Sequence, residues 1–224
     1  MRKDRRLPMI GYYNASVILT YVGLVLAVVG IIQALDGRPQ AAILCLMGAG
    51  LCDMFDGTIA RMCDRSEEEK AFGVQIDSLC DLVCFGILPM IIGYAVGNTS
   101  WVGTACQAAY MLAVVIRLGY FNVQEIWRAQ EDGEKRTHYE GLPVTAVSLL
   151  LPAGLLLDIP TRFSILRFYN FALLTLAIFF IAKIRVKKPY GKTLLILSAI
   201  GIALFVLVCR FGGEIGCLRS TVVR

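Results

Sequence analysis

Long apolar stretches run through most of the chain, and short polar segments separate them. A hydrocarbon core about 30 Å thick needs about 20 residues of helix to cross it. The pattern therefore predicts about seven membrane-spanning helices, with six or eight as the alternatives, near residues 13–35, 40–61, 73–97, 101–121, 142–158, 163–184 and 191–210. The fifth of these is the shortest, and Pro143 and Pro152 interrupt it.

Composition supports this interpretation. Hydrophobic residues make up 57% of the 224 residues and charged residues 17%, and the mean hydropathy is +0.67. A soluble domain of this size is far less apolar. We therefore expect an all-α integral membrane protein, in which residues 1–224 form a single multi-pass membrane domain.

Basic residues are distributed unevenly between alternate connecting segments. If the N-terminus is cytoplasmic, fifteen Lys and Arg residues lie in the inner segments and three in the outer loops. The positive-inside rule favours this orientation in the cell membrane. The net charge of +5 then fits basic segments that meet anionic lipid headgroups. No long basic run or RNA-binding aromatic motif indicates a nucleic-acid partner.

Four aspartates lie at helical spacing within two of the apolar stretches. Asp53 and Asp56 are near the end of the second predicted span, and Asp77 and Asp81 are near the start of the third. Residues three or four apart share a helix face, and one acidic side chain at the centre of a membrane helix costs about 2.5–3.5 kcal/mol. Two such pairs facing each other would form an oxygen-rich cage for hard divalent cations. The spacing therefore predicts a metal site at the cytoplasmic membrane surface.

Small residues accompany the two acidic pairs. Gly57 and Ala60 follow Asp56, and Gly73 lies one turn before Asp77. Small side chains there would let a ligand lie against the helix backbone, although such residues in membrane helices also serve close helix packing. A groove beside a metal cage suits a nucleotide diphosphate. A purely structural or ion-conducting role for the carboxylates is the alternative.

The order of these residues resembles a family motif. The segment 53–81 reads D-x-x-D-G-x-x-A-R, then eleven residues, then G-x-x-x-D-x-x-x-D. This resembles the motif of the CDP-alcohol phosphatidyltransferases, membrane enzymes that exchange the CMP of a CDP-linked lipid for an alcohol. Residues 67–89, RLGYFN at 117–122 and EGLPVTA at 140–146 are similar to the phosphatidylserine synthase branch of that family.

The resemblance implies a reaction and a role for each motif residue. A serine hydroxyl would attack the β-phosphorus of CDP-diacylglycerol and release CMP, with two divalent ions, Mg²⁺ or Mn²⁺, at the diphosphate. The expected metal ligands are Asp53, Asp56, Asp77 and Asp81. Asp81 would also be the catalytic general base. The CDP-lipid would contact Gly57, Ala60, Arg61 and Gly73. Family membership also implies a homodimer in the lipid bilayer with its active cavity open to the cytoplasmic side.

Three further polar residues are candidates for contacting the substrate phosphate or the serine. Arg117 lies within an apolar span, where an arginine is costly enough to suggest a function. Asn122 could hydrogen-bond the polar substrate, but it equally suits a helix end. Lys188 could attract anionic lipid, although a basic inner segment is usually explained by topology alone. Arg61 has a similar alternative as an anchor at the membrane interface.

Three functions remain open at this point. The first is transfer to L-serine, and the second is transfer to glycerol 3-phosphate, inositol or inositol phosphate by a sibling enzyme. The third is cation transport along the carboxylates. A transporter would place such residues nearer the membrane midplane and would have broken, repeated spans. The aspartates lie at span ends and the sequence shows no repeat, which favours an enzyme.

Overall fold

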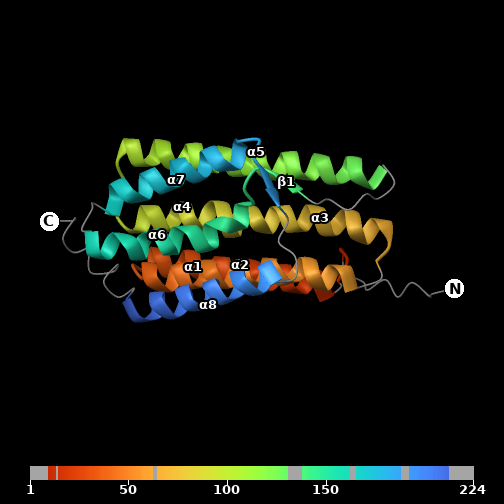
Figure 1. Cartoon of the computed structure of the whole chain (residues 1–224), viewed down its shortest axis with the longest axis horizontal. Helices are drawn as coiled ribbons and strands as arrows, with labels where there is room; N and C mark the ends of the chain where they lie inside the picture. The colour runs from red at the N-terminus through yellow and green to blue at the C-terminus, as the bar shows by residue number, and fades with distance from the viewer. Residues whose placement is uncertain are drawn as a thin grey trace.

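The computed structural model describes residues 10–13, 15–62, 65–130, 138–161, 165–187 and 192–211. Its helices lie side by side along the long axis of the molecule (Figure 1). They are α1 (Ala15–Leu35), α2 (Pro39–Met62), α3 (Glu67–Asp81), α4 (Leu88–Ala95), α5 (Trp101–Gln130), α6 (Val147–Thr161), α7 (Ile165–Ile181) and α8 (Lys192–Phe211). A π-helical segment η1 (Leu82–Ile87) joins α3 to α4, and a 3₁₀ turn η2 (Val144–Ala146) precedes α6. Two short strands, β1 (His138–Glu140) and β2 (Arg185–Lys187), pair antiparallel.

The prediction of an all-α membrane protein is confirmed for the described residues, apart from the short β1–β2 ribbon. Four helical segments are long and apolar enough to cross a membrane: Val17–Leu35, Pro39–Ala60, Glu67–Ala95 and Trp101–Trp127. Three shorter apolar helices follow: Val144–Leu156, Arg167–Ile181 and Ile196–Phe211. These segments correspond in order to the seven predicted from the sequence.

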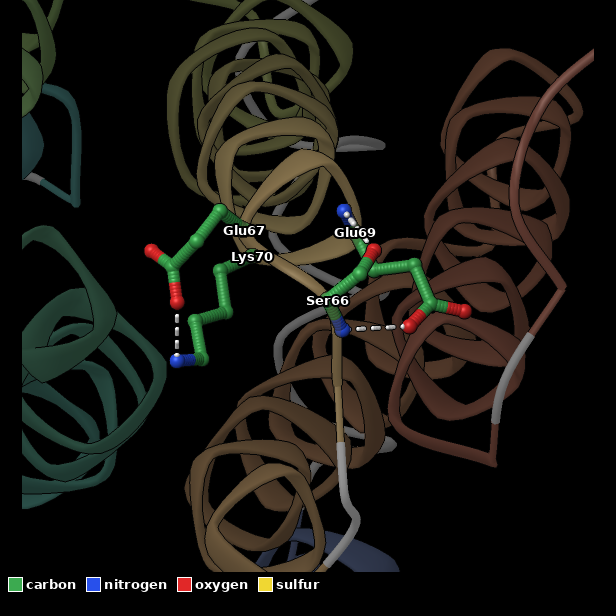
Figure 2. A network of polar contacts seen from close by, with 4 residues as sticks. All are labelled: Ser66, Glu67, Glu69 and Lys70. Atoms are coloured by element: carbon green, nitrogen blue, oxygen red, sulfur yellow. Dashed lines mark hydrogen bonds and ion pairs between the residues drawn. The ribbon is translucent and has the colours of Figure 1, made fainter. Parts of the chain in front are cut away.

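The third segment begins earlier than its predicted start at residue 73, because a capping box starts the helix at Glu67 (Figure 2). The Glu69 amide donates to the Ser66 hydroxyl at 3.2 Å, and the Ser66 amide donates to the Glu69 carboxylate at 2.8 Å. Lys70 pairs with Glu67 at 2.7 Å on the exposed face. Acidic residues in a first turn also suit the positive end of the helix dipole. The charged run therefore forms an exposed helix start that leads into the membrane segment.

A π-helical turn interrupts the third span directly after Asp81. Pro89 has no backbone N–H, so it cannot donate to the Phe85 carbonyl four residues earlier, as a residue within an α-helix would. The buried Tyr110 hydroxyl from α5 donates to that Phe85 carbonyl. The Tyr169 hydroxyl from α7 donates to the Pro89 carbonyl at 2.5 Å. Two buried phenol groups thus satisfy the irregular backbone and tie the third span to α5 and α7.

Apolar side chains on the outer surface match a membrane environment. On α1, large aliphatic side chains recur at three- and four-residue intervals and are exposed: Ile18, Val22, Val25, Val29 and Ile32. A stripe of this kind on one helix face fits contact with lipid chains. The opposite face of α1 packs against α2 and α3.

Close approach between α2 and α6 depends on a glycine. A Cβ atom added to Gly50 would overlap the hydroxyl of Ser148. That hydroxyl is itself fixed, because it donates to the Thr145 carbonyl at 2.7 Å. Gly50 is therefore a packing residue, as expected for small residues where membrane helices meet.

We predict that Gly50→Ala destabilises the fold by about 1–3 kcal/mol, the range for overpacking a filled interface. Thermal unfolding of the purified protein in detergent measures the effect. Gly119→Ala on α5 is the matched control, since its added Cβ would have no described atom within 4 Å apart from the adjacent residues and nearby backbone of its own helix. A Gly50→Ala protein as stable as this control would contradict the packing role.

Candidate metal centre

Three of the four aspartates converge between α2 and α3. Carboxylate oxygens of Asp53 and Asp56, from α2, and of Asp77, from α3, all lie within 4.8 Å of one another. Asp56 is only 7% exposed, and the other two are partly buried. Carboxylate oxygens are the ligands that hard divalent cations prefer. The cluster therefore has the donor atoms and the closeness that a divalent metal requires.

Local structure explains why these residues meet. Asp53 and Asp56 share a face of α2 because they are three residues apart. Residues 63–66 separate α2 from α3, so the late part of α2 lies near the early part of α3 (Figure 1). The capping box at Ser66 fixes where α3 begins and thus sets the position of Asp77 along it. The helical periodicity of the sequence predicted this convergence correctly for three carboxylates.

Asp81 lies one turn beyond Asp77, at the last residue of α3 before the π-helical segment. It does not belong to the trio whose oxygens lie within 4.8 Å of one another. It is close enough to interact electrostatically with Asp53, Asp77 and Asp56. Its predicted role as a fourth ligand and as the general base stays a prediction.

The glycines beside the aspartates differ from the packing glycines elsewhere. Apart from the adjacent residues and nearby backbone of its own helix, a Cβ added to Gly57 would have no described atom within 4 Å, and at Gly73 the nearest would be Nη1 of Arg65 at 3.4 Å. Neither glycine has a positive φ angle. Neither backbone conformation nor tight packing among the described residues therefore demands glycine at these two positions. The missing side chain leaves open space at Gly57 and room for the Arg65 guanidinium at Gly73.

Arg65 lies close to the motif residue Gly73, and the sequence did not indicate this position. Sequence reasoning treats it only as part of the basic inner segments, because it lies in the variable spacer of the motif. Its guanidinium group lies beside Gly73. Its Nε atom is buried and has no hydrogen-bond partner in the described part of the chain. A guanidinium group whose Nε–H has no hydrogen-bond partner among the described residues thus lies beside Gly73, which is one turn before Asp77.

The remaining two CDP-lipid candidates, Ala60 and Arg61, lie near the end of α2. Ala60 is partly buried on α2, one turn after Asp56. Arg61 is also on α2, but its side chain lies outside the described residues, as does all of Lys188. Their predicted contacts with substrate stay predictions.

Arg117 is buried, with 6% of its surface exposed, and contacts the segment that follows β1. Its Nε donates to the Leu142 carbonyl at 3.2 Å, and its Nη2 donates to the Gly141 carbonyl at 3.4 Å. Gly141 has a φ of +83°, and a Cβ there would lie 3.0 Å from the Phe180 carbonyl oxygen. Glycine is required at this turn, since other residues rarely adopt such a φ. Arg117 thus holds a glycine-dependent turn against α5.

Asn122 connects α5 to α3 on either side of Asp77. Its Oδ1 accepts a hydrogen bond from the Ser78 hydroxyl at 2.6 Å, and its Nδ2 donates to Gln75 Oε1 at 3.4 Å. Ser78 is buried. Asn122 therefore helps to fix the helix that carries Asp77. A direct contact with substrate, predicted from the sequence, remains a prediction.

These features define a multi-pass membrane protein with an acidic, metal-compatible centre between two consecutive spans. The family model described as CDP-alcohol phosphatidyltransferase matches residues 13–182, and the chain belongs to this family. The resemblance predicted from the motif is thereby confirmed.

Curated relatives carry a more specific name, CDP-diacylglycerol–serine O-phosphatidyltransferase. The protein of that name from Mycobacterium leprae is 35% identical over 118 residues, which are 50% of this chain and 37% of the relative. The one from Saccharomyces cerevisiae is 34% identical over 105 residues, 46% of this chain and 37% of the relative. The one from Bacillus subtilis is 26% identical over 114 residues, 50% of this chain and 58% of the relative. The matched region thus spans less than two thirds of each relative.

We predict that Asp77→Asn weakens Mn²⁺ binding at least about tenfold, because loss of an outer partner of a metal ligand alone costs 10- to 100-fold. Titration of the detergent-solubilised protein with Mn²⁺, followed by electron paramagnetic resonance, gives the affinity without any substrate. Asp36→Asn is the control, because Asp36 is exposed in the turn after α1. Equal losses in the two variants would argue against a metal centre at the cluster.

Proposed function

We propose that the protein is a phosphatidylserine synthase, which transfers the phosphatidyl group of CDP-diacylglycerol to the hydroxyl of L-serine. The observation that carries this proposal is the convergence of Asp53, Asp56 and Asp77 within the matched family region. The acceptor follows from the relatives, whose name specifies serine.

Transfer of the phosphatidyl group requires that the negative charge of the diphosphate be neutralised. Asp53, Asp56, Asp77 and Asp81 would hold two divalent ions, Mg²⁺ or Mn²⁺, which neutralise charge on the diphosphate and on the departing CMP when bound. Between them these carboxylates supply oxygen ligands from both helices. The close approach of three of the four supports this assignment.

Asp81 is proposed as the general base. The serine oxygen forms a bond to the β-phosphorus, the bond from that phosphorus to the oxygen of CMP breaks, and the hydroxyl proton passes to the Asp81 carboxylate. Its position one turn beyond Asp77 and outside the close trio supports this additional role beside metal binding. As a partly buried carboxylate near three others, it would orient the hydroxyl as well as accept its proton.

The CDP-lipid would lie over Gly57 and Gly73, with Ala60 and Arg61 alongside. The open space at Gly57, and the absence of tight packing at Gly73, support this placement. An arginine binds phosphate oxygens through its forked guanidinium, and Arg61 is proposed for this contact. Arg117, on α5, would bind a phosphate or the serine carboxylate. Asn122 would contact the polar substrate, and Lys188 would attract anionic lipid.

The site is proposed to open toward the cytoplasm, with the N-terminus on the same side. The excess of basic residues in the inner segments supports this orientation. Lipid substrate would then enter sideways from the inner leaflet and serine from the cytoplasm. Family membership also suggests a homodimer.

The proposal is tested by CMP release from CDP-diacylglycerol and a divalent metal, with and without L-serine, and with mass analysis of the lipid product. We expect serine-dependent CMP release and a phosphatidylserine product, both abolished by a chelator and by Asp81→Asn. Release only with glycerol 3-phosphate, inositol or inositol phosphate would move the enzyme to a sibling branch. Metal-driven ion flux in liposomes without CMP release would favour transport instead.

We also predict that Gly57→Ala reduces kcat/KM for CDP-diacylglycerol by about 10- to 100-fold, since a displacement of about 1 Å in a bound substrate can cost that much. Its thermal stability should match that of the unmodified protein, because the added methyl group meets no described atom of another helix within 4 Å. The control is Gly119→Ala, which adds the same methyl group at an equally open position on α5. Full activity of Gly57→Ala would exclude a substrate groove at this position.

A further inference from the structure

Helix α1 contributes a polar side chain to the metal centre, although the motif lies entirely on α2 and α3. The Thr20 hydroxyl donates a hydrogen bond to Oδ2 of Asp56 at 3.0 Å. Thr20 is 8% exposed and Asp56 is 7% exposed, so the bond is shielded from solvent. The packing of α1 against both α2 and α3 brings the hydroxyl to this position.

The bond constrains how Asp56 can present its oxygens. An ionised carboxylate only accepts hydrogen bonds, and it has two oxygens with about four acceptor positions. A hydroxyl that donates to Oδ2 occupies one of these positions and restricts rotation of the carboxylate group at the cluster. A cation bound there would find its ligand already oriented.

We propose that Thr20 is a positioning residue for the metal centre, holding Asp56 in the orientation that binds the divalent ion. The inference rests on the proposed function for the metal role of Asp56. Outer hydrogen-bond partners of metal ligands commonly have this effect on affinity. On this basis α1 contributes to the metal centre and also presents a face to lipid.

A purely structural role for the bond would be to hold α1 against α2, but other contacts already provide this. A Cβ added to Gly30 would lie 2.9 Å from Cβ of Cys45, and one added to Gly23 would lie 3.5 Å from Cβ of Cys52. These glycines bring the two helices together along their length. Replacing Thr20 with a side chain of the same shape that lacks the hydroxyl should therefore leave α1 and α2 in place.

The test compares Thr20→Val, which has nearly the same shape without a hydroxyl, with Thr20→Ser, which keeps the hydroxyl. Mn²⁺ affinity is measured by electron paramagnetic resonance in detergent without substrate, and metal-free thermal midpoints are recorded in parallel. We expect Thr20→Val to bind Mn²⁺ about 10- to 100-fold more weakly, and Thr20→Ser to bind it nearly as well as the unmodified protein. Metal-free thermal midpoints of all three should be similar.

Thr104→Val is the matched control, because the Thr104 hydroxyl donates to the Ser100 carbonyl at 3.1 Å on the exposed surface of α5. Its Mn²⁺ affinity should be unchanged. If Thr20→Val does not yield folded protein, Thr20→Ala removes the same hydroxyl without a replacement methyl group and carries the same expectation.

Two results would overturn the positioning role: unchanged Mn²⁺ affinity in Thr20→Val, or an equal loss in Thr20→Ser. The proposed function fails in a distinguishable way. An unmodified protein that binds Mn²⁺ with the expected dependence on Thr20, but transfers no phosphatidyl group to any alcohol, would refute the synthase and support the positioning role.

Discussion

The mutual repulsion of carboxylates in a low-dielectric setting is the constraint on which the rest of the structure depends. At an effective dielectric constant of about 20, two unit charges 4.8 Å apart repel each other by about 3.5 kcal/mol. The trio of Asp53, Asp56 and Asp77 contains three such pairs. One hydrogen bond to a charged group contributes about 1.5–3 kcal/mol, so the Thr20 hydroxyl cannot offset the repulsion. A bound divalent cation can, because its positive charge attracts all three carboxylates.

The surrounding helices are fixed by polar contacts that apolar packing alone would not supply. Tyr110 and Tyr169 satisfy carbonyls in and beside the π-helical segment that follows Asp81. Asn122 joins α5 to the Ser78 hydroxyl, next to Asp77. Lipid is as apolar as the side chains that face it, so helices in a membrane gain little from burying apolar surface against one another. Specific hydrogen bonds and close contacts therefore decide where each carboxylate lies.

The sequence predicted those parts of the structure that depend on local periodicity. Span positions follow from hydropathy, and the convergence of Asp53, Asp56 and Asp77 follows from helical spacing at two adjacent span ends. The start of α3 at Glu67 was also present in the sequence as S-x-x-E at Ser66, but hydropathy alone placed the span later. The contacts of Thr20 and Arg117 could not be predicted in this way, because each joins residues distant in sequence whose meeting depends on how whole helices pack.

Two glycines of α2 show how the structure separates a packing residue from a candidate ligand-binding residue. From sequence alone, helix packing is an alternative to ligand binding for the motif residue Gly57, and Gly50 lies only two turns earlier on the same helix. The structure separates them: at Gly50 an added Cβ overlaps Ser148, and at Gly57 it enters open space. The absent side chain at Gly50 is explained by a neighbouring helix, whereas no packing contact among the described residues explains the one at Gly57. The motif glycine is thus the one that packing among the described residues does not require, and this supports the proposed position of the substrate groove on α2.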